Sequence, residues 1–339
     1  MSDWYLVLAP VAALAVLALV RFVGCQALLN VDEVEYKNTY SETVMSDSPV
    51  SYWRFQELHS AEPAPGPTVP NTPVVGGTAK DEMNRNDGTY KAVLLQAPPP
   101  APLPPDSPGA PGALTLLAPG LLDQSEQQKT SMNVDGGYVE VPFSNSLNLP
   151  SFTVEALVRP EWNPAETGLY RAVVTCAMID VTPSAPKAFG FGVFAGPDPG
   201  NPTGPDVWQI WLSDGTTFKP FKDPARNLAP VDFTKTNYLA VIYDDGTKKL
   251  NMFAWVAGTD LDSGVAHPLK DVSVPAYSPV SNATQSLLIG MHRPPIGSGA
   301  PGSFALYHPF KGRIQEVAIY SKALIPERVM SHVMIGLHV

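Results

Sequence analysis

The stretch FTVEALVRP, residues 152–160, alternates apolar and mostly polar side chains. Phe152, Val154, Ala156 and Val158 fall on one side of an extended chain, because successive side chains of a strand point to opposite faces. A period of two over this length predicts a β-strand with an apolar side and a mostly polar side. We therefore expect a fold built on sheets.

Further strand-like runs follow at short spacing, separated by turns rich in glycine and proline. They cover residues 138–141, 170–178, 207–212, 238–244, 250–256, 286–289 and 314–320. The Asp245-Gly246 step predicts a hairpin turn between two of these runs. Helical periodicity is confined to residues 326–333, where Pro326 suits the first helical position. Many short strands of this kind predict an all-β, antiparallel β-sandwich or jelly roll.

The composition is that of a folded, acidic protein. Hydrophobic residues make up 44% of the 339 residues, enough for a sizeable core. The chain carries 22 basic and 32 acidic residues, for a net charge of −10, and its longest basic run is Lys248-Lys249. A nucleic-acid binder needs a basic face, so nucleic acid is excluded as a partner.

An uncharged apolar run occupies residues 4–20, close to the beginning of the chain. Its length approaches the roughly 20 helical residues that cross the hydrocarbon layer of a membrane. Trp4 and Tyr5 are suited to one membrane interface and Arg21 to the other. The pattern predicts a single transmembrane helix within residues 1–24.

Two other interpretations of this segment stay open. Residues 22–25 are similar to a lipoprotein processing site, in which case Cys25 carries the lipid. A cleaved secretory signal is the third interpretation, although a basic residue before the apolar run is lacking. The positive-inside rule, with only Arg21 and Lys37 to count, would leave the remaining chain inside the cell.

The composition also suggests domain boundaries. We expect an anchor at residues 1–24, a polar stalk at residues 25–48 and a β-sandwich at residues 49–339. Proline-rich stretches, which favour extended loops over sheet interiors, predict three insertions in the sandwich. They lie near residues 61–75, 97–112 and 179–206.

Seven segments occur in an order typical of one family. They are YWRF (52–55), AKDEMNRNDGTY (79–90), DGGYVEVP (135–142), FTVEALVRP (152–160), YLAVIYDDGTKKLNMF (238–253), LLIGM (287–291) and FKGRIQEVAIYSKAL (310–324). Together they resemble the laminin-G-like jelly roll of the concanavalin A-like lectin/glucanase superfamily, from about residue 40 to the C-terminus. The resemblance implies a domain outside the cytoplasm, periplasmic or at the cell surface, and we prefer this location to the one that the positive-inside rule gives.

The superfamily resemblance also implies what a catalytic member would carry. Its glycoside hydrolases place their carboxylates in an ExDxxE pattern, so that acid and nucleophile share one face of a strand. No glutamate of this chain is followed two residues later by aspartate, and Glu140 and Glu155 stand alone on their strands. We therefore expect no enzyme, and a glycoside hydrolase is the least favoured function.

Calcium is the cofactor that the resemblance makes worth considering, since laminin-G-like domains often bind one ion. Asp81, Asn84, Asn86 and Asp87 supply several oxygen ligands within seven residues, of the kind calcium prefers. We name Asp81, Asn86 and Asp87 as candidate ligands. Against this, Gln315 stands where the family commonly has aspartate, and a turn before Gly88 explains the cluster equally well.

Two tryptophans in residues 207–212 are three positions apart and so face opposite sides of a strand. Trp208 shares its side with apolar residues and is expected in the core. Trp211 shares its side with Gln209, which predicts a solvent-facing pair that binds a ligand or partner. The alternative is that proline-rich insertions cover Trp211.

Taken together, these features predict a non-enzymatic, membrane-anchored recognition or assembly module. Two kinds of partner stay open within that class. One is an extracellular glycan, bound by a lectin-like surface protein. The other is a set of protein subunits in a larger respiratory or photosynthetic membrane complex.

Overall fold

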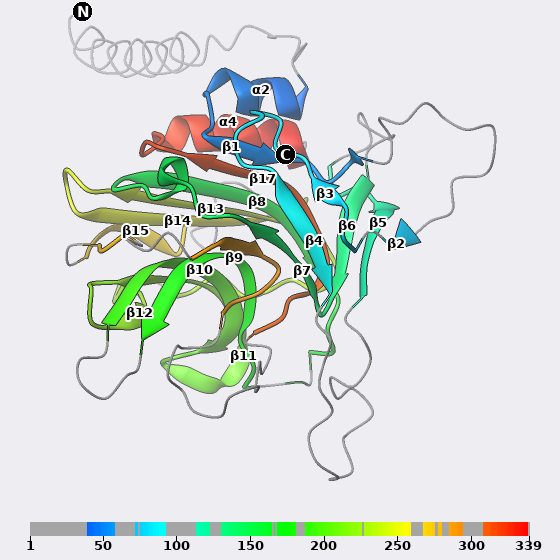
Figure 1. The fold of residues 1–339 in the computed structure, drawn as a ribbon. Coiled ribbons are helices and arrows are strands. Elements are labelled where there is room, and N and C mark those ends of the chain that lie inside the picture. Colours follow the sequence, from blue (N-terminus) through cyan, green and yellow to red (C-terminus); the bar gives the residue numbers. More distant parts are fainter. Residues whose placement is uncertain are drawn as a thin grey trace, which may run out of the picture. The chain divides into compact units, whose positions relative to one another are not determined.

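Two antiparallel sheets lie face to face in the computed structural model (Figure 1). They belong to the unit Tyr40–Val339, one of two into which the chain divides. The described residues are 39–57, 72–73, 75–92, 113–122, 130–164, 166, 168–180, 187–225, 227–258, 267–274, 277–279, 285–293 and 308–337.

The first sheet, called sheet A, has nine strands among the described residues. In spatial order they are β15 (Leu269–Ser273), β14 (Lys249–Val256), β13 (Asn237–Asp244), β8 (Phe152–Pro160), β17 (Lys311–Tyr320), β6 (Thr130–Asp135), β5 (Ala113–Pro119) and β2 (Thr72–Pro73), with β1 (Ser51–Trp53) also paired to β17. The Asp-Gly hairpin is confirmed, because β13 and β14 pair in register up to Asp244 opposite Lys249.

The second sheet, called sheet B, has eight strands in the described part of the chain. In spatial order they are β12 (Phe218–Pro220), β11 (Asn201–Ser213), β10 (Lys187–Asp198), β9 (Arg171–Asp180), β16 (Leu287–Ile289), β7 (Gly137–Val141), β4 (Gly88–Ala92) and β3 (Thr78–Ala79). A short 3-10 helix, η2 (Asn145–Leu147), follows β7. The predicted all-β sandwich is thus confirmed.

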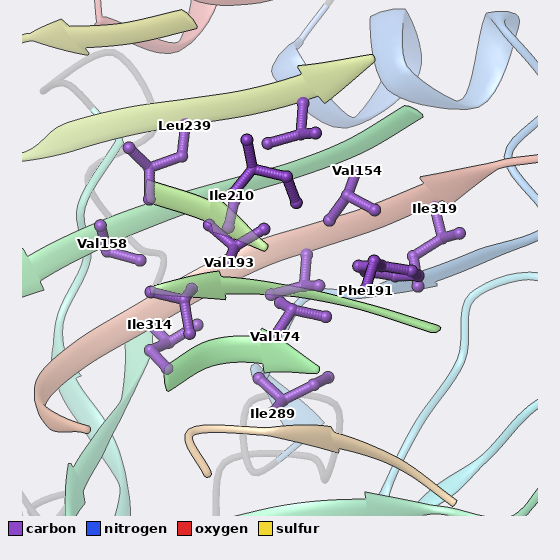
Figure 2. Packing of buried hydrophobic residues seen from close by; sticks show 14 of the residues in the cluster. Val154, Val158, Val174, Phe191, Val193, Ile210, Leu239, Ile289, Ile314 and Ile319 are labelled. Carbon is purple, nitrogen blue, oxygen red and sulfur yellow. The ribbon is translucent and has the colours of Figure 1, made fainter. Parts of the chain in front are cut away.

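The main core fills the space between the two sheets. It takes alternate side chains from both, as shown by Val154 and Ile319 of sheet A and by Phe191, Val193 and Ile210 of sheet B (Figure 2). Close packing of branched and aromatic side chains from both layers is what holds such sheets together. The core position predicted for Trp208 is confirmed, since its side chain is wholly buried in this cluster.

Two helices cover the other face of sheet A. Helix α2 (Tyr40–Ser46) and helix α4 (Pro326–Leu337) lie on the side turned away from sheet B (Figure 1). A second apolar cluster forms beneath them and includes Leu157 of β8. The mostly polar side of β8 is therefore covered, and Glu155 on it is completely buried.

A charged cluster lies within this second interface. His332 of α4 places Nδ1 at 2.9 Å from a carboxylate oxygen of Glu155 and Nε2 at 3.0 Å from Asp47. Arg328 contacts the same Asp47 at 2.9 Å, and Tyr320 donates its hydroxyl to Glu155 at 3.2 Å. Burial disfavours a charged imidazole, but the two carboxylates outweigh it and raise the pKa of His332.

Two of the expected domain boundaries differ from the structure. Residues 40–48 are not stalk, because α2 buries Tyr40 and Val44 and belongs to the sandwich. Residues 187–206 are not an inserted loop, because they form β10 and the beginning of β11 within sheet B. Pro197 lies at a register shift between the two strands, the kind of position at which a sheet tolerates proline.

The predicted membrane anchor lies outside the described residues, as do Trp4, Tyr5, Arg21 and Cys25. Among the residues that are described, no helix is long and apolar enough to cross a membrane. The predictions for residues 1–24 therefore stay predictions.

Candidate functional site

The outer face of sheet B is where Trp211 lies, and it carries an unusual concentration of aromatic rings. Its strand register aligns Pro220, Trp211, Gly192 and Thr175 across β12, β11, β10 and β9. Side chains directly opposite each other in an antiparallel sheet share one face. These positions therefore form one row across the outer face, with Trp211 near its β12 end.

Trp211 and five further rings contact one another in a connected group, which we call the ring cluster. They are Tyr170, Phe194, Trp211, Phe218, His292 and His308. The Trp211 ring centroid lies 5.1 Å from that of Tyr170, 5.3 Å from Phe194 and 5.6 Å from Phe218. These separations are typical of favourable edge-to-face and tilted aromatic pairs.

Burial differs within the ring cluster. Phe194 and His292 are buried, whereas Trp211, Phe218, Tyr170 and His308 are each partly exposed. The inner rings thus support outer rings that keep part of their surface available. Trp211 is neither a freely solvated side chain nor a covered one, so neither of the two expectations for it describes it fully.

Glycines at alternate positions of β10 make room for the rings. A Cβ atom added at Gly192 would stand 2.5 Å from the Phe194 ring, and one at Gly196 would collide with the Tyr170 ring. Because glycine has no side chain, both rings can lie directly against the backbone of the strand. The sequence signal for this face is the set of glycines at positions 190, 192 and 196, whereas the prolines of residues 179–206 predict an insertion.

Gln209 is not solvent-facing, contrary to the expectation from strand alternation. It is completely buried, although it lies on the same outer face as Trp211. Its Oε1 accepts a hydrogen bond from the Trp211 indole Nε1 at 3.1 Å. Its Nε2 donates to the carbonyl oxygens of Pro197 at 2.8 Å and Gly196 at 3.3 Å. Its own surface is therefore unavailable to a ligand.

The two histidines of the ring cluster are held in their neutral form. Burial, together with the repulsion from a charge on the neighbouring His308, lowers the pKa of His292 to about 3. Burial also lowers the pKa of His308 to about 4, despite a backbone hydrogen bond at Tyr170 that acts the other way. Near neutral pH the ring cluster therefore carries no charge of its own.

We expect acid to destabilise the sandwich through these histidines. The unfolded chain binds protons near pH 6.5, whereas folded His292 does so only near pH 3, so stability falls as pH falls between these values. Each such group steepens the dependence by up to about 1.4 kcal/mol per pH unit. Urea unfolding from pH 7 to pH 4 measures it. His292→Phe should flatten the curve, and an unchanged slope would contradict the assignment.

An ion pair lies at the far end of the same face. Arg293, which follows His292, places a guanidinium nitrogen 2.5 Å from Glu140 of β7. Ser286 donates its hydroxyl to the same carboxylate oxygen at 3.0 Å. Lys219 of β12 and Lys222, which follows this strand, also have carboxylates within 4.0 Å, from Asp214 and Asp198. These three cations are thus paired within the described part of the protein.

The candidate calcium ligands form a hydrogen-bonded turn. The two carboxylate oxygens of Asp81 accept backbone N–H groups from Tyr52, Met83, Arg85 and Asn86. Such contacts satisfy a buried carboxylate without a metal ion.

The side chains of the other two candidate ligands are also engaged in hydrogen bonds within the protein. Asp87 accepts the Asp81 N–H and the Lys80 ammonium, and the Asn86 amide donates to Ser51 at 2.6 Å. No group of three or more His, Cys, Asp or Glu in the described residues is arranged to hold a metal ion. The turn interpretation accounts for the cluster.

Gln315 and Glu316 are buried on β17, and their side chains form hydrogen bonds within the protein. Gln315 accepts the Leu121 N–H at 2.6 Å, and the Glu316 carboxylate receives hydrogen bonds from Tyr52, Gln56 and Gln315. Glu316 has φ +53° and lies at a register shift between β17 and β8. Its left-handed backbone is thus part of a β-bulge held by a polar network.

The two glutamates considered as candidate catalysts lie on different sheets. Glu140 is on β7 of sheet B and Glu155 on β8 of sheet A. Each points away from the core that separates the sheets, so the two cannot flank one glycosidic bond as a hydrolase requires. The arrangement gives no support to that function.

No protein-family profile matches the chain, and no curated protein matches it. Among solved structures, a candidate carbohydrate binding protein from Bacteroides ovatus is similar over 59% of this chain and 45% of its own, with 18% identity and a TM-score of 0.36. The Ruminococcus gnavus IT-sialidase CBM40 bound to α2,3 sialyllactose matches over 54% and 82%, with 15% identity and a TM-score of 0.31.

The enzymatically active domain of the bacteriophage CBA120 tailspike protein 2 is also similar, over 65% of this chain and 30% of its own, with 12% identity and a TM-score of 0.35. At such low identities and TM-scores, these similarities carry no argument about this chain. The class that the structure itself defines is an all-β antiparallel sandwich, with helices on one outer face and an aromatic cluster on the other.

Proposed function

We propose that this chain is a laminin-G-like recognition module that binds neutral glycans through the ring cluster on sheet B. The observation that carries the proposal is that the partly exposed Trp211 ring packs against three other aromatic rings. Aromatic rings are large, rigid contact surfaces that lose little conformational entropy on binding. The C–H groups of a sugar ring can pack on such a surface.

The uncharged character of the site supports a neutral ligand. His292 and His308 stay neutral near pH 7, and Arg293, Lys219 and Lys222 are paired with carboxylates. An acidic sugar would compete with these carboxylates for the cations, whereas a neutral glycan would not.

A glycan array tests the proposal with the full chain. We expect wild-type protein to bind neutral glycans in preference to their sialylated counterparts. Trp211→Ala should weaken this binding by at least about tenfold, the equivalent of ~1.4 kcal/mol, because it removes an aromatic contact. Trp255→Phe serves as control, since Trp255 lies under the helices of sheet A. Equal binding by Trp211→Ala and wild type would contradict the proposal.

For the location, we propose a membrane-anchored domain outside the cytoplasm. The apolar run of residues 4–20 supports the anchor, and the laminin-G-like resemblance supports the side of the membrane. The N-terminal sequence of the membrane-extracted protein tests this. A chain that retains residues 1–24 agrees with it, whereas a mature chain that begins at Cys25 or later contradicts the helical anchor.

A further inference from the structure

The hydrogen bonds of Gln209 connect two parts of the ring cluster that the strands alone do not fix. One end of its amide accepts the Trp211 indole N–H at 3.1 Å. The other end donates to the carbonyl oxygens of Gly196 and Pro197, where β10 changes register. The Tyr170 ring packs on Gly196 at this same point.

We propose that Gln209 is a positioning residue that holds the Trp211 indole in its ligand-binding orientation, an inference that rests on the proposed function of the ring cluster. Without this hydrogen bond, a partly exposed tryptophan on the outer face of a sheet can exchange between side-chain rotamers. A hydrogen bond from its single N–H to a buried, doubly anchored amide selects one of them. The ligand then meets a surface that is already ordered, which lowers the entropy cost of binding.

The chemistry at this position requires an acceptor on one side and a donor on the other. Glutamine has both in one planar group. A carboxylate in its place keeps the acceptor for the indole but turns a second oxygen toward the carbonyls of Gly196 and Pro197. Those carbonyls and burial favour the protonated acid, whose O–H replaces the lost amide donor. Gln209→Glu should therefore regain the native arrangement as pH falls.

The pH range for this comparison is set by the groups that face the site. His292, His308 and Tyr170 are the titratable members of the ring cluster around Gln209, and the Lys222–Asp198 ion pair lies at the end of β10. The pKa values of about 3 and about 4 for the two histidines leave them neutral at pH 5. The charge of the ring cluster in wild-type protein is thus the same at pH 5 and at pH 7.5.

Hydrogen exchange of the Trp211 indole N–H, followed by NMR, measures the positioning without any ligand. The signal is identified by its absence in Trp211→Phe. After correction for intrinsic exchange, Gln209→Leu should exchange at least about tenfold faster than wild type. The Trp211 indole of Gln209→Glu should show the same faster exchange at pH 7.5, and its exchange rate should return toward the wild-type rate at pH 5.

Gln285→Glu is the matched control, because Gln285 is also buried and donates to a backbone carbonyl, that of Ala177, at 2.8 Å. It should leave the Trp211 signal unchanged at both pH values. An indole that exchanges equally fast in wild type and Gln209→Leu would overturn the inference, as would a Gln209→Glu variant that does not respond to pH.

The same variants on a neutral-glycan array separate this inference from the proposed function. If it holds, Gln209→Leu should lose at least about tenfold in affinity, and Gln209→Glu should recover affinity at pH 5. Wild-type binding that depends on Trp211 but not on Gln209 would overturn the inference and leave the function standing. Normal indole protection with no glycan bound by any variant would contradict the function instead.

Discussion

Trp208→Ala should lower the free energy of unfolding by about 3–5 kcal/mol, the range found for emptying a large buried aromatic site. Trp208 is completely buried between the sheets. Its indole N–H also donates to Asn237 at 3.1 Å, and the Asn237 amide in turn holds the backbone of Asp232 and Lys235. The substitution therefore opens a cavity and weakens the loop that leads into β13. Urea unfolding measures the effect.

Two companion variants show where this energy comes from. Trp208→Phe keeps an aromatic ring in the core but loses the hydrogen bond, so it should cost less than Trp208→Ala. Trp211→Ala should also cost less, because Trp211 is partly exposed and leaves a smaller cavity. Equal losses for Trp208→Ala and Trp211→Ala would show that Trp211 is a core residue, and its face would then be no binding site.

His332→Leu should destabilise the fold by about 3–5 kcal/mol, the usual cost of breaking a buried ion pair by removing one partner. Glu155 is completely buried and would lose the cation that faces it at 2.9 Å. The double variant Glu155→Leu/His332→Leu leaves no unpaired charge at this point and should recover part of the loss. A double variant as unstable as the sum of the two single variants would contradict this account.

The ion pair also gives the fold a pH dependence of definite sign. The pKa of His332 is raised in the folded state. Its contribution is fully present below the imidazole pKa of the unfolded chain, about 6.5, and is lost as pH rises through the higher folded value. The difference in stability between wild type and His332→Leu should therefore shrink as pH is raised above 6.5. This trend is opposite to that of His292.

The strands could be read from the sequence because their signal is local. Residues 152–158 alternate with a period of two whatever lies around them, and the Asp-Gly step at residue 245 sets a turn without help from the core. The periodicity of residues 326–333 and Pro326 predict helix α4 in the same local way. Its packing on β8, however, joins residues 177 positions apart, as in the contact of His332 with Glu155, and no local pattern contains that information.

The candidate site was predictable in part for the same reason. Alternation correctly placed Trp208 and Trp211 on opposite faces of β11, and it placed Gln209 beside Trp211. It could not show that the carbonyls of Gly196 and Pro197 bury the glutamine, since that depends on a register shift in the neighbouring strand. The prolines of residues 179–206 predict a loop, whereas the glycines between them fit a strand that packs rings against its backbone.

Amide hydrogen exchange of the full chain, with and without a neutral glycan selected on the array, tests the central claim most directly. Ligand bound on the ring cluster should slow exchange in β10, β11 and β12 of sheet B and leave β13, β14 and β15 of sheet A unchanged. Trp211→Ala should abolish the protection at the same glycan concentration. Protection confined to sheet A, or protection of sheet B that persists in Trp211→Ala, would contradict the claim that this face is the binding site.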